Sequence, residues 1–194
     1  LRRGARRSGY LVRSRDGVVW NEVRPLNPVG NETTLLHLGS GRWLAASREF
    51  AKPDSSDVHL ELLTSTDDAR TWKRAMPLTL PGQIPAHLLR LRDGRVLVTY
   101  GVRNRGNYGV HIRLSEDEGK TWGPPMRIAD APESDCGYPS CVQLPEGQVV
   151  TAYYTKLSAD YHYEIRNGYV VVRCNSKDRS IRRSSPETQA AGSP

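Results

Sequence analysis

Apolar and polar residues alternate along this chain in short runs, which is the pattern of β-strands with one buried face. Three stretches share one form: an alternating run, a tight turn with glycine, and a second run. They are residues 34–46, 88–100 and 141–153. Each predicts a β-hairpin, because glycine adopts the positive φ that such turns require. The turn glycines are Gly41, Gly94 and Gly147, spaced 53 and 53 residues apart, so the hairpins belong to an internal repeat.

A second motif follows the hairpins. Residues 65–72 and 115–122 match Ser-x-Asp-x-Gly-x-Thr-Trp, except that Ala69 replaces the glycine in the first copy. A shortened copy spans residues 14–20. Asp and Ser side chains satisfy backbone N–H groups in tight turns, and the tryptophan is expected to pack beneath the turn. Each repeat therefore reads as a hairpin, a third strand, this turn (hereafter the Asp turn) and a fourth strand.

Four-stranded units of about 50 residues are typical of β-propeller blades. The Asp turn resembles the Asp box, or BNR repeat, of sialidases (neuraminidases), whose fold is a six-bladed propeller. The resemblance implies an all-β chain with an incomplete propeller of three to four blades. We expect a basic segment at residues 1–13, the partial propeller at 14–173 and a disordered tail at 174–194, where Ser, Pro, Ala and Gly dominate.

The distribution of charge disfavours nucleic-acid binding, and the short apolar runs exclude a membrane span. The net charge of +7 lies in the chain ends: residues 1–30 contribute +5 and residues 173–194 contribute +3, which leaves −1 for the remainder. A nucleic-acid-binding domain carries its basic patch on the folded body, so we expect no nucleic-acid partner. No apolar run approaches the 18 residues of a membrane span, so none is expected.

Metal and cofactor sites are not expected from the sequence. The three cysteines stand at no spacing typical of a metal site, and the histidines do not cluster. Structural thiols and structural or exposed histidines are the simpler interpretation. The sequence therefore predicts no metal and no cofactor.

Candidate chemistry comes from the hairpin register. Residues at similar distances before and after a hairpin turn meet at its open end. Four charged or phenolic side chains stand seven to nine positions from a turn glycine and are expected at one rim: Glu32, Arg48, Arg103 and Tyr138. His87, seven residues before its glycine, is expected near the same rim, and Arg105 follows Arg103 closely.

This set suits an acidic sugar. Arginines bind carboxylates through bidentate hydrogen bonds. A carboxylate nucleophile would be repelled by the substrate's own carboxylate, whereas a phenol with a neighbouring base would not. Sialidases are the glycosidases that use a tyrosine nucleophile.

The family comparison assigns roles to these residues. The segment at Asn31–Glu32 resembles the one whose Glu activates the tyrosine, and Gly137–Tyr138 resembles the nucleophile segment. Arg48 resembles an arginine of the carboxylate-binding triad, with Arg103 a candidate for another and Arg105 close behind. His87 is expected to line the pocket. The resemblance thus implies a retaining exo-glycosidase acting on terminal sialic-acid-type or other acidic glycans.

Two parts of the family pattern are missing. No Arg-Ile-Pro-like segment supplies the first triad arginine, and no position matches the acid/base Asp. Asp135 lies near Tyr138 in sequence, but a solvated loop residue is the simpler interpretation. The chain alone is therefore expected to be inactive. A non-catalytic propeller that binds glycans or protein remains the main alternative, and a nucleic-acid binder working through the basic ends, with steep salt dependence, is a third.

Overall fold

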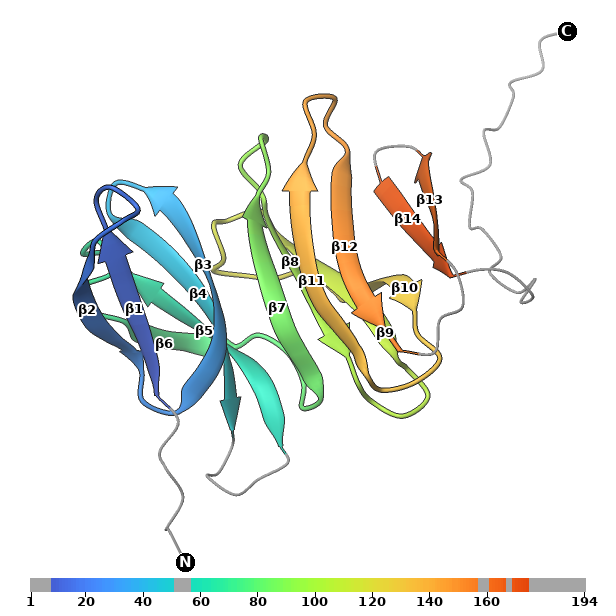
Figure 1. The fold of residues 1–194 in the computed structure, drawn as a ribbon, viewed down its shortest axis with the longest axis horizontal. Helices are drawn as coiled ribbons and strands as arrows, with labels where there is room; N and C mark the ends of the chain where they lie inside the picture. Colours follow the sequence, from blue (N-terminus) through green and yellow to red (C-terminus); the bar gives the residue numbers. More distant parts are fainter. Residues whose placement is uncertain (1–7, 51–56, 157–160, 167–168, 175–194) are drawn as a thin grey trace, which may run out of the picture.

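The chain is built from β-sheets placed side by side in a row (Figure 1). The computed structural model describes residues 8–50 and 57–156 together with the backbone of two strands at 161–166 and 169–174. The first full sheet has the order β3-β4-β5-β6 and the second β10-β9-β8-β7, so the strands are neighbours in chain order. Their bounds are β3 (Gly30–Gly39), β4 (Arg42–Phe50), β5 (Val58–Ser65), β6 (Lys73–Pro77), β7 (Gln83–Arg90), β8 (Val96–Val102), β9 (Gly109–Ser115) and β10 (Met126–Asp130).

Both full sheets are antiparallel throughout, as the repeat predicts. The predicted hairpins form β3–β4, β7–β8 and β11–β12, and the turn glycines have φ of 71°, 92° and 92°. The prediction of an all-β fold made of four-stranded propeller blades is therefore confirmed. The described sheets make up part of a propeller, with two complete blades flanked by two further sheets (Figure 1).

The two flanking sheets differ from the full blades. Strands β1 (Gly9–Ser14) and β2 (Trp20–Asn27) form a two-stranded sheet joined by the shortened Asp turn. β1 begins inside the segment that the sequence assigns to a basic terminus. At the other end, β11 (Cys136–Gln143), β12 (Val149–Thr155), β13 (Tyr161–Arg166) and β14 (Tyr169–Cys174) have the order β11-β12-β14-β13, with β12 and β14 parallel. Residues 175–194 of the expected tail lie outside the described residues.

The Asp turns hold the third and fourth strands of a blade together. Asp117 accepts hydrogen bonds from Thr121 and Ser115, and the first of these is the main reason that its pKa falls to about 2. The indole of Trp122 donates to the Gly119 carbonyl oxygen over 3.1 Å and packs against the core. The copy at 65–72 repeats the Ser, Asp and Thr contacts. In the shortened copy, Trp20 is exposed and does not cap a core.

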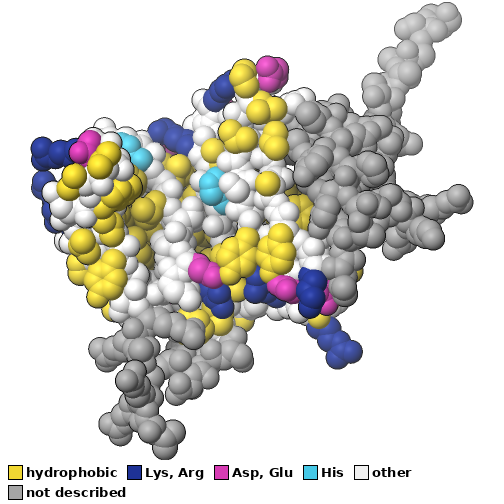
Figure 2. All heavy atoms as spheres, in the orientation of Figure 1, with side chains coloured by type: hydrophobic (Ala, Val, Ile, Leu, Met, Phe, Trp, Pro, Cys, Tyr) yellow, Lys and Arg dark blue, Asp and Glu magenta, His cyan; other side chains and the backbone are white. Residues whose placement is uncertain are grey.

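The hydrophobic core lies between blades. Alternate side chains of β4 and β5 pack against those of β7 and β8 in one continuous cluster that includes Leu60, Leu62, Val98 and Tyr100. The outer face of β1–β2 is different, because Tyr10, Trp20 and Val23 are all more than half exposed. Figure 2 shows hydrophobic side chains gathered over this region at the left of the view.

Replacing Gly119 by Ala is expected to lower the free energy of unfolding by about 1–3 kcal/mol. Gly119 has φ of 90°, and an added Cβ would lie 2.8 Å from Leu44 Cδ1. Ala69 is the matched control, because it holds the equivalent position with φ of 54° and a buried methyl group. Ala69→Gly relieves backbone strain but loses that burial, so it should change stability by less than about 1 kcal/mol. Urea unfolding measures both. Equal effects of the two substitutions would contradict this account of the turn.

Candidate active site

The inner strand of each blade is interrupted at the same place. The pairing register shifts between Gly30 and Thr33 in β3, between Gln83 and Ala86 in β7, and between Gly137 and Ser140 in β11. All three irregularities precede the turn glycine of their hairpin by nearly the same number of residues. A bulge redirects side chains that regular pairing would place on a sheet face. Two of these bulges carry Glu32 and Tyr138.

The structure brings Glu32 and Tyr138 into direct contact. The Tyr138 hydroxyl donates a hydrogen bond of 2.5 Å to Glu32 Oε1, although the two residues are 106 positions apart. Arg48, on the strand paired with β3, donates from Nη1 to the other oxygen, Glu32 Oε2, over 2.7 Å. One carboxylate therefore links the phenol to a guanidinium group.

Tyr138 adopts a backbone conformation that few side chains tolerate. Its φ is 48°, in the left-handed region, and Gly137 before it has φ of 115°. A Cβ on Gly101 of β8 would lie 2.8 Å from Gly137 Cα, so the two glycines allow β11 to approach the neighbouring blade closely. Strain of this kind persists where surrounding contacts hold it, and it is common at functional sites. The Tyr138 side chain is exposed at this point of β11.

Arg103 completes a cluster of four residues with Glu32, Arg48 and Tyr138, which we call the rim cluster. Its guanidinium carbon lies 5.6 Å from the centre of the Tyr138 ring, and its Nε donates to the Cys136 carbonyl oxygen over 3.1 Å. Two arginine nitrogens in the cluster, Arg48 Nε and Arg103 Nη2, are buried and have no hydrogen-bond partner among the described residues. Buried donors without partners are costly, so a ligand that accepts from them would be favoured.

The electrostatics fix the protonation of the pair. Burial alone would raise the pKa of Glu32, but hydrogen bonds from Tyr138 and Arg48 outweigh it and hold the pKa below its ordinary value. The hydrogen bond to Glu32, with help from burial, raises the pKa of Tyr138 above its ordinary value. At neutral pH the pair is therefore a carboxylate beside a neutral phenol.

A second phenol–carboxylate pair stands beside the first. The Tyr154 ring lies 5.8 Å from that of Tyr138, and its hydroxyl donates to Asp135. Asp135, expected from the sequence to be a solvated loop residue, is exposed but also accepts this hydrogen bond from Tyr154. Tyr154 could have been found from the sequence by its place in the β11–β12 hairpin, where it pairs with Gly137, the residue before Tyr138.

The two remaining predicted residues are placed differently. His87 is half-buried, and its Nδ1 accepts a hydrogen bond from the Cys141 backbone N–H over 3.0 Å. Burial lowers its pKa, which favours a neutral ring. This hydrogen bond joins β11 to β7, and none of the described contacts joins His87 to the rim cluster. Arg105 is exposed in a turn beyond Arg103 and is not brought to Glu32 or Tyr138 by any of the described contacts.

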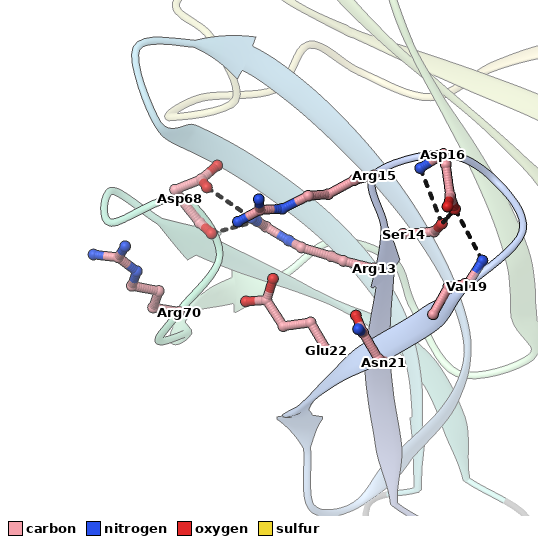
Figure 3. Close-up of a pocket in the computed structure, with 9 residues that line it drawn as sticks. All are labelled: Arg13, Ser14, Arg15, Asp16, Val19, Asn21, Glu22, Asp68 and Arg70. Atoms are coloured by element: carbon pink, nitrogen blue, oxygen red, sulfur yellow. Dashed lines mark hydrogen bonds and ion pairs between the residues drawn. The ribbon is translucent and has the colours of Figure 1, made fainter.

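A hollow of about 640 Å³ lies elsewhere, between the β1–β2 sheet and the first full Asp turn (Figure 3). Arg13 reaches across it to Asp68, while Arg15 and Arg70 lie at its sides (Figure 3). None of the predicted site residues lines it. The rim cluster lies apart from this hollow, and it is where unpaired arginine donors and a hydrogen-bonded phenol–carboxylate pair occur together.

Comparison with known proteins agrees with this architecture. Residues 4–151 match the family model described as BNR repeat-like domain. No curated protein matches the chain. A solved structure of a protein of unknown function from Dyadobacter fermentans DSM 18053 is similar at 26% identity and a TM-score of 0.63, over 85% of this chain and 44% of that one.

Two glycosidase structures are more distant. The Hadza microbial sialidase Hz136 has 18% identity and a TM-score of 0.45, over 75% of this chain and 38% of that one. A xylan β-1,4-xylosidase from Bacillus halodurans C-125 has 14% identity and a TM-score of 0.49, over 70% and 33%. The chain spans less than half the length of each of these structures. Within the described residues, no helix has the length and apolar character needed to cross a membrane.

Replacing Arg48 by Gln is expected to raise the pKa of Glu32. The substitution removes a cation that stabilises the carboxylate, so Glu32 should bind its proton at higher pH than in the unchanged protein. Titration of the Glu32 side-chain carboxyl carbon by NMR measures this shift. Arg70→Gln, at an exposed position outside the rim cluster, is the control and should leave the titration unchanged. An unchanged or lower pKa in Arg48→Gln would contradict the described contact.

Proposed function

This chain belongs to the BNR repeat-like domain family. On that basis we propose that its rim cluster is part of the active site of a retaining exo-glycosidase. The proposed enzyme removes terminal acidic sugars of the sialic-acid type. The observation that carries the proposal is the 2.5 Å hydrogen bond from Tyr138 to Glu32 beside two arginines with unpaired donors.

In the proposed mechanism, Arg48 and Arg103 hold the carboxylate of the sugar. Their buried, unpartnered nitrogens offer charge-assisted hydrogen bonds that a neutral sugar would not use. The same positive charge lowers the cost of bringing an anionic substrate towards Glu32. A specificity for acidic sugars follows from this arrangement.

Tyr138 is the proposed nucleophile. As its oxygen forms a bond to the anomeric carbon, the phenolic proton passes to Glu32 and the bond to the leaving-group oxygen breaks. The leaving oxygen takes a proton from an acid. Water then attacks the anomeric carbon from the face opposite Tyr138 and gives its proton to the conjugate base of that acid. The bond between the Tyr138 oxygen and the sugar breaks, Glu32 returns its proton to that oxygen, and the sugar is released with retained configuration.

The neutral phenol suits this substrate. A carboxylate nucleophile would meet the sugar's carboxylate with like charge, whereas Tyr138 approaches without charge and develops it only as its proton leaves. The lowered pKa of Glu32 keeps it ionised and able to accept that proton at neutral pH. The proposed reaction therefore requires both Tyr138 and Glu32, joined by their hydrogen bond.

Tyr138→Phe tests the nucleophile, in the protein expressed with every residue that its gene encodes. The substitution removes one oxygen and should lower kcat/KM on an aryl sialoside by about 10³-fold or more, with the melting temperature little changed. Tyr10→Phe, an exposed tyrosine in β1, is the matched control and should keep full activity. Full turnover by Tyr138→Phe would exclude the tyrosine mechanism.

Arg48→Lys tests the carboxylate recognition. Lysine keeps the charge but loses the planar fork, so KM for an acidic sugar should rise by about 10- to 100-fold. Arg70→Lys serves as the control. If neither Tyr138→Phe nor Arg48→Lys changes turnover or binding, the rim cluster is not the site, and a glycan- or protein-binding propeller becomes the better account.

A further inference from the structure

A second cluster of ionisable side chains lies on the same blade, on the other face of β4 and β5. Glu49 pairs with His59 in the β4–β5 register, and Glu61 follows on the same face of β5. Glu49 is 1% exposed and Glu61 is 3% exposed. One carboxylate oxygen from each and a ring nitrogen of His59 lie within 4.8 Å of one another. None of these residues belongs to the rim cluster.

The negative charge of this cluster is only partly balanced. Arg74 Nη2 lies 2.9 Å from Glu49 Oε2 and 3.2 Å from Glu61 Oε2, so one guanidinium group serves two buried carboxylates. Its own side chain is 58% exposed. Burying two carboxylates against a single, largely solvated cation leaves a charge whose burial is costly.

The remaining contacts leave one carboxylate oxygen of this cluster without a hydrogen bond. Asn27 of β2 donates to Glu49 Oε1 over 2.6 Å, so that oxygen is already used. Glu61 Oε2 is buried and accepts no hydrogen bond from the described residues. His59 Nε2 lies 3.4 Å from this oxygen.

We propose that Glu49, His59 and Glu61 form a binding site for one divalent transition-metal ion, with Zn²⁺ the best fit. Two carboxylate oxygens and one imidazole nitrogen match the ligands that Zn²⁺ takes in proteins, at about 2.0–2.2 Å each. Small movements of the three side chains reach these distances. The ion takes the place of Arg74, whose exposed side chain turns out to solvent, and a water completes the coordination.

The site has a structural consequence for the fold. The ion joins β4 to β5, and the hydrogen bond from Asn27 to Glu49 extends this connection to β2. Glu49 follows Arg48 directly in β4. Metal binding therefore stiffens the strand that presents Arg48 from its opposite face. The inference stands on contacts outside the rim cluster and does not depend on the proposed glycosidase activity.

Calorimetric titration of the chelator-stripped protein with Zn²⁺ tests the proposal. We expect one site whose affinity falls at least tenfold in His59→Gln and in Glu61→Gln. The matched controls are His37→Gln, whose ring stacks on Trp43, and Glu22→Gln, whose carboxylate pairs with Arg24 at the surface. Both controls should bind as the unchanged protein does. Absence of binding, or binding that survives both ligand substitutions, would overturn the proposal.

Arg74→Met gives an independent readout that does not require removal of a ligand. The substitution removes the competing cation, so the affinity for Zn²⁺ should rise about tenfold or more, equivalent to about 1.4 kcal/mol. The rise in melting temperature on adding Zn²⁺ should also be larger than in the unchanged protein. Weaker Zn²⁺ binding in Arg74→Met would show that Arg74 supports the cluster and does not compete with an ion, which would contradict the proposal.

Discussion

The hydrogen bond between Tyr138 and Glu32 is the contact on which the candidate site depends. It joins the inner strands of two blades, β11 and β3, that are not adjacent in the row of sheets. Regular strand pairing would place the Tyr138 and Glu32 side chains on the sheet faces and not in contact with each other. Both strands are bulged at equivalent places, and the close approach of Gly101 and Gly137 sets how near the blades come. The site is therefore a product of blade packing and not of one local motif.

Within a blade, the contacts that stabilise the fold and the candidate site residues lie at opposite ends. In the first full blade, the Asp68 backbone N–H donates to the Gly41 carbonyl oxygen over 2.8 Å, so the Asp turn lies beside the hairpin turn. Glu32 and Arg48 lie at the other, open end of the same hairpin. Regular hydrogen bonding and tryptophan packing hold one end of the blade, which allows bulges, positive φ and unpaired arginine donors at the other.

The repeated elements could be predicted from the sequence because they follow from periodicity and turn chemistry. The three hairpins follow from alternation around a glycine turn, and the Asp turns from a repeated motif. The meeting of Glu32, Arg48, Arg103 and Tyr138 follows from counting residues from the turn glycines. The count says nothing of bulges, so the positive φ of Tyr138 and the pairing of Tyr154 with Asp135 were missed. Arg105 shows a further limit, since it is exposed in a turn and no described contact joins it to Glu32 or Tyr138. The cluster of Glu49, His59 and Glu61 was also missed. Its members meet through the pairing register of β4 and β5, and the sequence alone does not fix that register.

Trapping the covalent intermediate tests the central claim most directly. A fluorinated sialosyl fluoride carries an excellent leaving group and an electron-poor ring, which slows hydrolysis of the intermediate more than its formation. After incubation with the protein expressed from its whole gene, digestion and mass spectrometry locate the label. The account predicts one sugar per chain, on the phenolic oxygen of Tyr138. A label on Glu32 or on another residue, or turnover with no label at all, would contradict it.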